Sequence, residues 1–398
     1  MIPRRITRKL QQSVRDYPVV TVTGPRQSGK TTLVRSVFKQ YDYVSLENPE
    51  QRALCLDDPI GFLRHFKGPV ILDEVQRTPD IFSYIQGIVD EKDKPGQFIL
   101  TGSQNFLFLE TVTQTLAGRC AVLHLHPFSF DELNGRKGIE LSKLGNTCKR
   151  TEYSPSENLC DVLFTGFYPR IHDKGLDPQD WLGNYFQTYL ERDLRNVVNV
   201  GDSEVFRRFV RLCAGRNGSL LNMSSIASDC GISHTNVRRW ISVLESSFLV
   251  TLLRPHHRNF RKRLIKSPKL YFLDTGFLCY LLGIRSPEEL SLHAMRGAVF
   301  ESFVISESIK KRADAGKEAD IYFWRDSAGH EIDMLIEEGK ELIPAEIKSG
   351  ETFNRDFLKG IQYWKNISDK PDTPAAVIYG GDTSFMHQNT AIRSWMEI

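Results

Sequence analysis

Short apolar runs alternate with stretches of helical spacing in the first third of the chain. Such runs begin near positions 19, 69, 97 and 120, and each ends within a few residues in glycine or polar side chains. Continuous apolar runs of this length are typical of strands buried on both faces of a parallel sheet. We therefore expect a doubly wound α/β domain within residues 1–160.

The pattern changes twice more along the chain. Apolar residues recur at helical spacing from Trp181 to Val198, so a helical connector is expected over residues 161–204. Three short helical patterns and one strand pattern predict a small, mainly helical domain over 205–283. Strand and helix patterns alternate again over 284–398, which indicates a C-terminal α/β domain.

One glycine-containing loop stands between the first predicted strand and a predicted helix. The segment from Gly24 to Thr31, GPRQSGKT, fits the pattern G-x-x-x-x-G-K-[ST]. Glycines allow the backbone N–H groups and the helix N-terminus to face phosphates, while Lys30 would reach the β and γ phosphates and Thr31 would bind Mg²⁺. The expected ATP-binding residues are Gly24, Gln27, Ser28, Gly29, Lys30, Thr31, Thr32 and Ser103.

Two carboxylates, Asp73 and Glu74, end the second apolar run. Behind such a loop, Asp73 would hold Mg²⁺ through water and Glu74 would polarise the attacking water, which favours hydrolysis over binding alone. Ser103 follows the next run, where a polar side chain could sense the γ-phosphate. Arg119 would neutralise charge in the transition state, in its own subunit or across an interface, and a surface salt bridge is the alternative for it.

Several of these segments together resemble a known family. GPRQSGKTTLV, VILDEVQ, ILTGSQNF, LAGR and HLHPFSFDEL are similar to AAA-type ATPases of prokaryotes that carry an uncharacterised C-terminal domain. YFQTYLERDLRN and YFLDTGFLCYLLG resemble the same family, so the resemblance covers most of the chain outside 136–160. It implies ATP hydrolysis, and because AAA-type sites usually take an arginine from a neighbour, it also implies a homo-oligomer.

The segment 221–246 has the pattern of a helix-turn-helix. A helix over 224–229, Gly231 at the turn, Ser233 as N-cap and a second helix over 234–246 are expected. The side chains expected to point outward, of types that meet phosphates and bases, are His234, Asn236, Arg238 and Arg239. A basic stretch over 254–263 precedes the next strand, as the wing of a winged helix would. DNA is the expected partner, with a protein-binding module or an ATPase lid as alternatives.

Four charged residues of the C-terminal domain suggest a second site. Glu301 lies on one face of a predicted helix that begins at Gly297, and Asp333 begins a strand. Strand alternation places Glu346 and Lys348 on one face of the next strand. This order resembles the PD-(D/E)XK nuclease fold. The resemblance implies Mg²⁺ or Mn²⁺ bound by Asp333 and Glu346, support of the nucleophile by Lys348, and an auxiliary role for Glu301. Gln362 directly precedes Tyr363, a departure from the Q-x-x-x-Y helix of some nuclease relatives.

The composition of the chain excludes some classes of protein but does not by itself indicate a function. The chain of 398 residues carries a formal net charge of +3, so any argument for nucleic acid must be local. No apolar run approaches the ~18 residues of a membrane span, and the first ten residues lack the apolar core of a signal peptide. Seven cysteines without C-x-x-C spacing are typical of free thiols, so a cytoplasmic protein is expected. The expected function is ATP hydrolysis coupled to DNA binding or processing; the alternative is an ATP-switched regulatory protein with an inactive nuclease-like scaffold.

Overall fold

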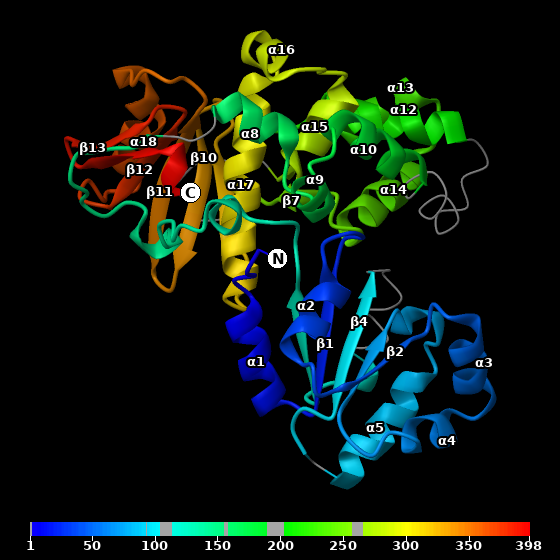
Figure 1. The fold of residues 1–398 in the computed structure, drawn as a ribbon. Helices are drawn as coiled ribbons and strands as arrows, with labels where there is room; N and C mark the ends of the chain where they lie inside the picture. Colours follow the sequence, from blue (N-terminus) through cyan, green and yellow to red (C-terminus); the bar gives the residue numbers. More distant parts are fainter. Residues whose placement is uncertain (1, 93, 104–113, 155–157, 189–202, 257–265) are drawn as a thin grey trace. The chain divides into compact units, whose positions relative to one another are not determined.

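The computed structural model describes residues 2–92, 94–103, 114–154, 158–188, 203–256 and 266–398. The chain divides into two compact units (Figure 1). The first contains residues 1–128 together with the short segments 246–248 and 312–318; the second contains 129–245, 249–311 and 319–398.

The first unit is built on a five-stranded parallel sheet in the order β2-β3-β4-β1-β5. The strands are β1 (Val19–Gly24), β2 (Asp42–Ser45), β3 (Val70–Asp73), β4 (Phe98–Ser103) and β5 (Cys120–His124). The helices are α1 (Thr7–Asp16), α2 (Lys30–Val37), α3 (Pro49–Asp57), α4 (Pro59–Arg64), the 3-10 helix η1 (Val75–Arg77) and α5 (Ile81–Lys92). The four apolar runs are thus confirmed as parallel strands.

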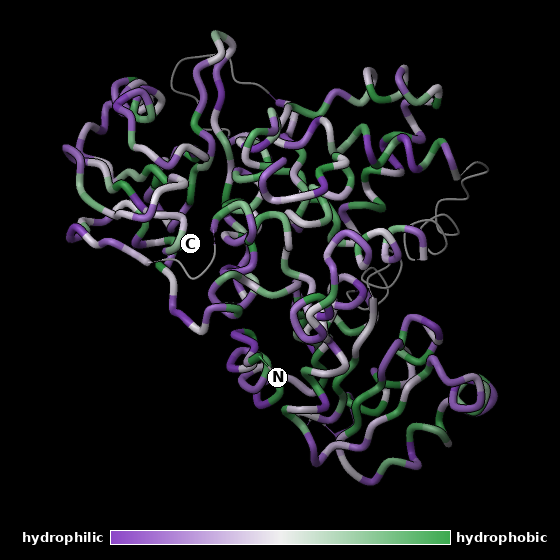
Figure 2. Tube along the Cα trace, turned by 45° about the horizontal axis from the view of Figure 1, so that its top comes forward, coloured by the Kyte–Doolittle hydropathy of each residue, from purple (hydrophilic) through white to green (hydrophobic). Residues whose placement is uncertain are grey.

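Helices cover both faces of this sheet. Val19 packs with α3, α4 and α5 in one core cluster, whereas Val20 and Val22 pack with α1 and α2 in another. This division follows from the alternation of side chains along a strand. The strands are largely green in Figure 2, while α1, beside the N label, is largely purple and buries only a narrow apolar stripe. The parallel strands therefore end at one common edge, where Gly24 pairs with Ser103 and Asp73 with Thr101.

The second unit begins earlier in the chain than the sequence suggested. The strand β6 (Thr151–Glu152) pairs with β13, the backbone N–H of Ile139 donates to Glu397 O, and Arg393 donates to Leu144 O. Residues 129–160, expected in the ATPase domain, therefore belong to the second unit. Phe130, Leu141 and Leu144 of this segment pack in the core of the second unit, and carbonyl oxygens such as Leu144 O make contacts that leave no mark in the sequence.

The middle of the second unit is helical, with one small hairpin. Its helices are α7 (Phe130–Asn134), the 3-10 helix η2 (Leu141–Lys143), α8 (Leu159–Thr165), α9 (Pro169–Lys174), α10 (Pro178–Tyr185), α12 (Ser203–Ala214), α13 (Met223–Cys230), α14 (His234–Ser246), α15 (Thr275–Leu282) and α16 (Pro287–Leu292). The hairpin pairs β7 (Val250–Leu253) antiparallel with β8 (Lys269–Phe272). Residues 189–198 of the expected connector helix lie outside the described residues.

A seven-stranded mixed sheet, in the order β6-β13-β14-β12-β11-β10-β9, completes the second unit. Its remaining elements are the long helix α17 (Arg296–Asp314), β9 (Ile321–Arg325), β10 (Glu331–Glu338), β11 (Glu341–Lys348), the 3-10 helix η4 (Arg355–Leu358), α18 (Lys359–Ile367), β12 (Ala375–Tyr379), β13 (Thr383–His387), β14 (Thr390–Ser394) and the 3-10 helix η5 (Trp395–Glu397). The strands β9, β10 and β11 are antiparallel, and β11 pairs parallel with β12. The expected C-terminal α/β domain is present in this form.

Candidate functional site

The loop between β1 and α2 has a backbone that only glycine can supply at two positions. Gly24 has φ of 153°, and a Cβ there would lie 2.1 Å from Leu125 O. Gly29 has φ of 91° and begins α2 as its N-cap, without a side-chain capping hydrogen bond. The first N–H groups of α2 therefore face the loop uncapped by a side chain, which is the arrangement that binds phosphate at helix N-termini.

Lys30 and Ser28 place a buried cation and a hydroxyl without a hydrogen-bond partner among the described residues in this loop. The buried Lys30 Nζ donates to Gly24 O at 3.0 Å and to Pro25 O at 2.8 Å, and burial lowers the pKa of this ammonium to about 8. The Ser28 hydroxyl is buried without a hydrogen-bond partner among the described residues. Both features fit a polyanionic ligand. Gln27, with φ of 64°, and Thr32 are exposed at the rim of the loop.

Thr31 and Asp73, the expected Mg²⁺ ligands, are in contact. Thr31 Oγ1 donates to Asp73 Oδ2 at 2.9 Å, and Tyr43 Oη donates to the same oxygen at 2.8 Å. Thr101 donates to Asp73 Oδ1. A hydroxyl and a carboxylate side by side beneath the phosphate loop fit Mg²⁺, which takes oxygen ligands and keeps several waters. Burial, followed by the charge of Asp73, raises the pKa of Tyr43 to about 12, so its hydroxyl stays protonated and donates.

Glu74 and Ser103 belong to one small hydrogen-bonded group. Glu74 has φ of 59° at the end of β3, and its Oε2 accepts from Gln76 Nε2. Gln76 Nε2 also donates to Ser103 Oγ at 3.1 Å, and Ser103 Oγ lies 3.5 Å from Glu74 Oε2. The expected water-polarising carboxylate and γ-phosphate sensor therefore lie together at the strand edge.

Arg119 lies at the opposite end of the sheet from this group. Its carbonyl accepts from Val19 N, at the first residue of β1, whereas the phosphate loop follows the last. Its guanidinium forms a salt bridge with Asp90, with Nη2 3.0 Å from Oδ2, on an exposed surface. A strand of six residues spans ~20 Å. The structure thus places Arg119 in a surface salt bridge, away from the phosphate loop of its own subunit, and its role in hydrolysis stays a prediction.

Three site residues of the first unit were missed by the sequence reading. Tyr43 lies on β2, whose run DYVS is short and half polar, so this strand was not predicted. Thr101 lay inside a predicted strand and was not singled out. Arg4 precedes the sheet by a whole helix, yet its Nη1 donates to Ser28 O at 2.8 Å and its Nη2 to His126 O at 2.6 Å. Its guanidinium thus fixes the backbone of the phosphate loop to the segment after β5.

The expected pair of helices in the second unit is α13 and α14. Gly231, with φ of 69°, ends α13, and Asn236 N donates to Ser233 Oγ at 3.2 Å, as a capping residue requires. The core side chains of the pair are Ile226, Val237, Trp240, Ile241 and Leu244. His234, Asn236, Arg238 and Arg239 are all exposed, as expected. Most of the basic stretch 254–263 lies outside the described residues.

Asp333 and Lys348 come together on the adjacent strands β10 and β11. Lys348 Nζ donates to Asp333 Oδ2 at 2.7 Å and to Glu346 Oε2 at 2.5 Å, and Ile347 N donates to Asp333 Oδ2 at 2.8 Å. Burial raises the pKa of Glu346 well above its usual value, with the charge of Asp333 acting in the same direction. Burial alone would raise the pKa of Asp333 too, but Lys348 holds it below the usual value.

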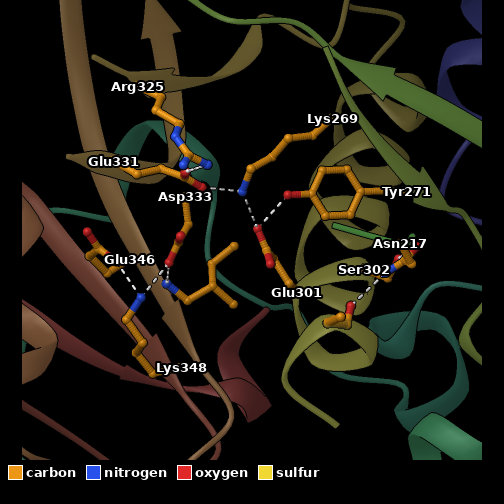
Figure 3. A network of polar contacts seen from close by, with 12 residues as sticks. Asn217, Lys269, Tyr271, Glu301, Ser302, Arg325, Glu331, Asp333, Glu346 and Lys348 are labelled. Atoms are coloured by element: carbon orange, nitrogen blue, oxygen red, sulfur yellow. Dashed lines mark hydrogen bonds and ion pairs between the residues drawn. The ribbon is translucent and has the colours of Figure 1, made fainter. Parts of the chain in front are cut away.

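Glu301 faces a different cation. Lys269 Nζ, on β8, donates to Glu301 Oε1 at 3.1 Å and is also paired with Glu331, while Tyr271 Oη donates to Glu301 Oε1. Arg325 Nη1 donates to Glu331 Oε2 at 3.0 Å. Figure 3 shows this group, which joins β8, α17, β9 and β10, beside the separate group that Lys348 forms with Asp333 and Glu346. Lys269 and Tyr271 were missed because nothing in a strand pattern links them to a carboxylate about 30 residues later.

The cluster in this form does not fit a metal ion. Within the described ranges, no group of three or more His, Cys, Asp or Glu side chains is placed to hold one. The expected set of Asp333, Glu346 and Glu301 is instead divided between two lysines. Lys348 bridges the first two residues, and Lys269 occupies the third.

Family models match three stretches of the chain. Residues 16–134 match the model described as AAA domain, and residues 156–288 and 296–396 match two domains of unknown function, DUF8612 and DUF4143. The first stretch contains the phosphate loop, Asp73, Glu74 and Ser103. The last contains Glu301, Asp333, Glu346 and Lys348.

Similar proteins come from bacteria and archaea. The chain is 30% identical over 388 residues to the uncharacterized proteins Rv2008c of Mycobacterium tuberculosis and Mb2031c of Mycobacterium bovis, covering 96% of this chain and 81% of each relative. Among solved structures, the Walker-type ATPase PABY2304 of Pyrococcus abyssi is 13% identical with a TM-score of 0.44, covering 71% of this chain and 96% of that protein. In the part that the structure describes, no helix has the length and apolar character needed to cross a membrane.

Proposed function

The chain belongs to the family that includes the two mycobacterial relatives, and it contains an AAA domain. We propose that it hydrolyses ATP with Mg²⁺ and couples hydrolysis to binding or processing of DNA. The AAA-type P-loop domain makes it an ATPase by fold and family. The proposed coupling to DNA rests on the second unit. The family models that match residues 156–288 and 296–396 of this unit describe domains of unknown function.

The roles at the ATP site follow from the contacts. Lys30, now held by loop carbonyls, would exchange them for the β and γ phosphates, and Thr31 and Asp73 would hold Mg²⁺. The ion would neutralise charge on the phosphates. Glu74 would polarise the attacking water, and Ser103, which shares Gln76 with it, would report the γ-phosphate to that carboxylate.

One observation carries the proposal for DNA. The hairpin strand β8, which follows the helix pair α13–α14, supplies Lys269 to the carboxylate network of the C-terminal sheet. We read α12, α13, α14 and the β7–β8 hairpin as a winged helix, and the sheet with α17 and α18 as nuclease-like. The proposed DNA-binding element and the carboxylate cluster of the nuclease-like sheet would then touch each other directly.

DNA contact by α14 is tested by the double substitution Arg238→Ala and Arg239→Ala. Fluorescence anisotropy with duplex DNA across a salt series should show weaker binding and a salt slope reduced by about 1.8, because each lost phosphate contact removes ~0.9. Arg285→Ala, at an exposed arginine of the same unit, serves as the control and should leave the slope unchanged. An unchanged slope in the double variant would remove α14 from the DNA interface.

Processing is tested by cleavage of linear and supercoiled DNA in Mg²⁺ or Mn²⁺, with and without ATP. Cutting that is lost in Lys348→Ala would assign it to the C-terminal cluster. Cutting that requires ATP and is lost in Lys30→Ala would establish coupling. A rate of ATP hydrolysis that rises with DNA would support coupling even without cutting.

A second candidate function is favoured by the charge balance of the cluster. Lys269 pairs with Glu301, and Lys348 pairs with Asp333 and Glu346, so two lysines already neutralise the carboxylates that a metal would need. An ATP-switched regulatory protein with an inactive nuclease-like scaffold would keep such a network for stability alone. No cutting in either metal, together with an ATPase rate indifferent to DNA, would select this alternative.

A further inference from the structure

The turn between β9 and β10 holds a histidine ring at the surface in a defined orientation. His330 Nδ1 lies 3.1 Å from Asp326 Oδ2, and because an ionised carboxylate only accepts, the ring N–H donates to it. Ala328 N and His330 N donate to Asp326 Oδ1 at 2.9 and 3.0 Å. The Asp326 side chain is fully buried, whereas that of His330 is 45% exposed. A buried carboxylate therefore orients an exposed ring.

One face of this ring is covered by an aromatic side chain of α18. The rings of His330 and Tyr363 are stacked, with centroids 3.7 Å apart and planes 8° apart, and Tyr363 Oη donates to Asp326 Oδ2 at 2.9 Å. Tyr363 also packs against the buried Trp324, with ring centroids 6.3 Å apart. Because Tyr363 occupies one face of the His330 ring, the exposed part of that ring includes its other face. A group of rings thus runs from Trp324 in the core to His330 at the surface.

The face of α18 that carries Tyr363 also carries groups that suit a nucleic acid. Lys359, Gln362 and Asn366 are exposed, and with Tyr363 they follow the i, i+3, i+4, i+7 spacing of one helix face. Lys359 pairs with Asp356 at 2.9 Å, but the two side chains are 74% and 66% exposed. Such a surface pair contributes little stability, so the ammonium can exchange it for a phosphate. The two amides are of a type that bonds base edges.

We propose that His330 is a stacking platform for an unpaired base of single-stranded DNA, and that Lys359 contacts the backbone of the same strand. Every nucleobase has a flat π-face that stacks on an aromatic side chain, histidine included. The bases of duplex DNA are stacked on one another, so this surface selects DNA that contains unpaired bases. The inference rests on the proposed DNA function and specifies the form of DNA that the C-terminal domain binds.

The fluorescence of 2-aminopurine within an oligothymidine strand tests this contact, because stacking on an aromatic ring quenches that base. The full-length wild type, at one fixed salt concentration, should quench the probe on binding. His330→Ala should lose the quenching and should weaken binding of the strand, measured by anisotropy, at least about fivefold, the lower end of what one stacked base contributes. His330→Phe keeps a flat ring without the hydrogen bond to Asp326, and should retain most of the quenching and the affinity.

Two further variants separate stacking from other effects. His65→Ala is the matched control, because it removes an exposed imidazole whose contact with Phe66 is edge to face and not stacked. It should leave quenching and affinity at the wild-type level. Lys359→Ala should lower the salt slope of single-strand binding by ~0.7, the value for one phosphate contact on a single strand. Urea unfolding followed by tryptophan fluorescence checks that the variants of the second unit are folded.

The outcomes distinguish the platform from the proposed function. Absence of quenching in the wild type would overturn the platform without any need for a variant to fold. Quenching and affinity in His330→Ala equal to those of the wild type would overturn it too, as would a His330→Phe variant that binds as weakly as His330→Ala. In each of these cases, duplex binding that depends on Arg238 and Arg239 would still support the proposed function. Binding of neither form of DNA would overturn both.

Discussion

The carboxylate of Glu346 lies against the backbone of Gly360: a Cβ at position 360 would stand 1.9 Å from Glu346 Oε1. Gly360 is the second residue of α18, and its φ lies outside the left-handed region. Position 360 therefore requires glycine because a larger residue has no room there. The backbone conformation alone would accept other residues. The helix α18 covers the Glu346 carboxylate so closely that any side chain at position 360 would displace either the helix or the carboxylate.

Gly360→Ala should destabilise the second unit by about 1–3 kcal/mol, the usual cost of overpacking a filled interior. All five tryptophans of the chain lie in that unit, so urea unfolding followed by tryptophan fluorescence reports on it alone. Gly297→Ala is the matched control at the second residue of α17, where the nearest atom to an added Cβ is 3.9 Å away. The control should be neutral or slightly stabilising, and equal stabilities for the two variants would contradict the packing argument.

The sequence predicted most of the first unit because its strands are buried on both faces. Val19–Gly24 and Phe98–Ser103 are almost entirely apolar or small, so burial shows directly in their composition. The strand β2 escaped because all four of its residues keep some exposure. Lys269 and Tyr271 escaped for another reason: their importance comes from a contact with Glu301, which only the packed structure creates.

Lys30→Met should lower the rate of ATP hydrolysis at least ~100-fold, because the variant removes the cation that faces the phosphates. Steady-state phosphate release measures this effect. Lys39→Met, at an exposed lysine just after α2, keeps the same change in net charge and should retain the wild-type rate. Comparable losses in both variants would mean that net charge, and not the position of Lys30, governs the rate.

Glu74→Gln should separate ATP binding from hydrolysis. The amide can no longer polarise water, so hydrolysis is expected to fall about 10²–10⁴-fold while nucleotide affinity stays within a few-fold of wild type. Fluorescent-nucleotide titration and phosphate release, measured on the same preparation, give both quantities. Ser103→Ala leaves the carboxylate in place and should have a smaller effect on the rate. Wild-type turnover in Glu74→Gln would exclude Glu74 as the water-polarising group.

Arg119→Ala should change the ATPase rate by less than twofold, since the guanidinium lies beside Asp90 at the far end of the sheet from the phosphate loop. Phosphate release measured alongside mass photometry with ATP provides the check. A loss of tenfold or more, in a protein that assembles with ATP, would mean that Arg119 reaches the site of a neighbouring subunit.

The return of residues 139–152 to the C-terminal sheet has a consequence for protein synthesis. Leu144 O accepts from Arg393, and the two residues are 249 positions apart. At ~5–20 residues per second, a ribosome needs roughly 12–50 s to make that interval. During this time residues 139–152 have been made, but the strand that contains Arg393 has not. The second unit can therefore complete its fold only after β14 (Thr390–Ser394) has been synthesised, whereas the sheet of the first unit is fully synthesised once residue 124 has been added.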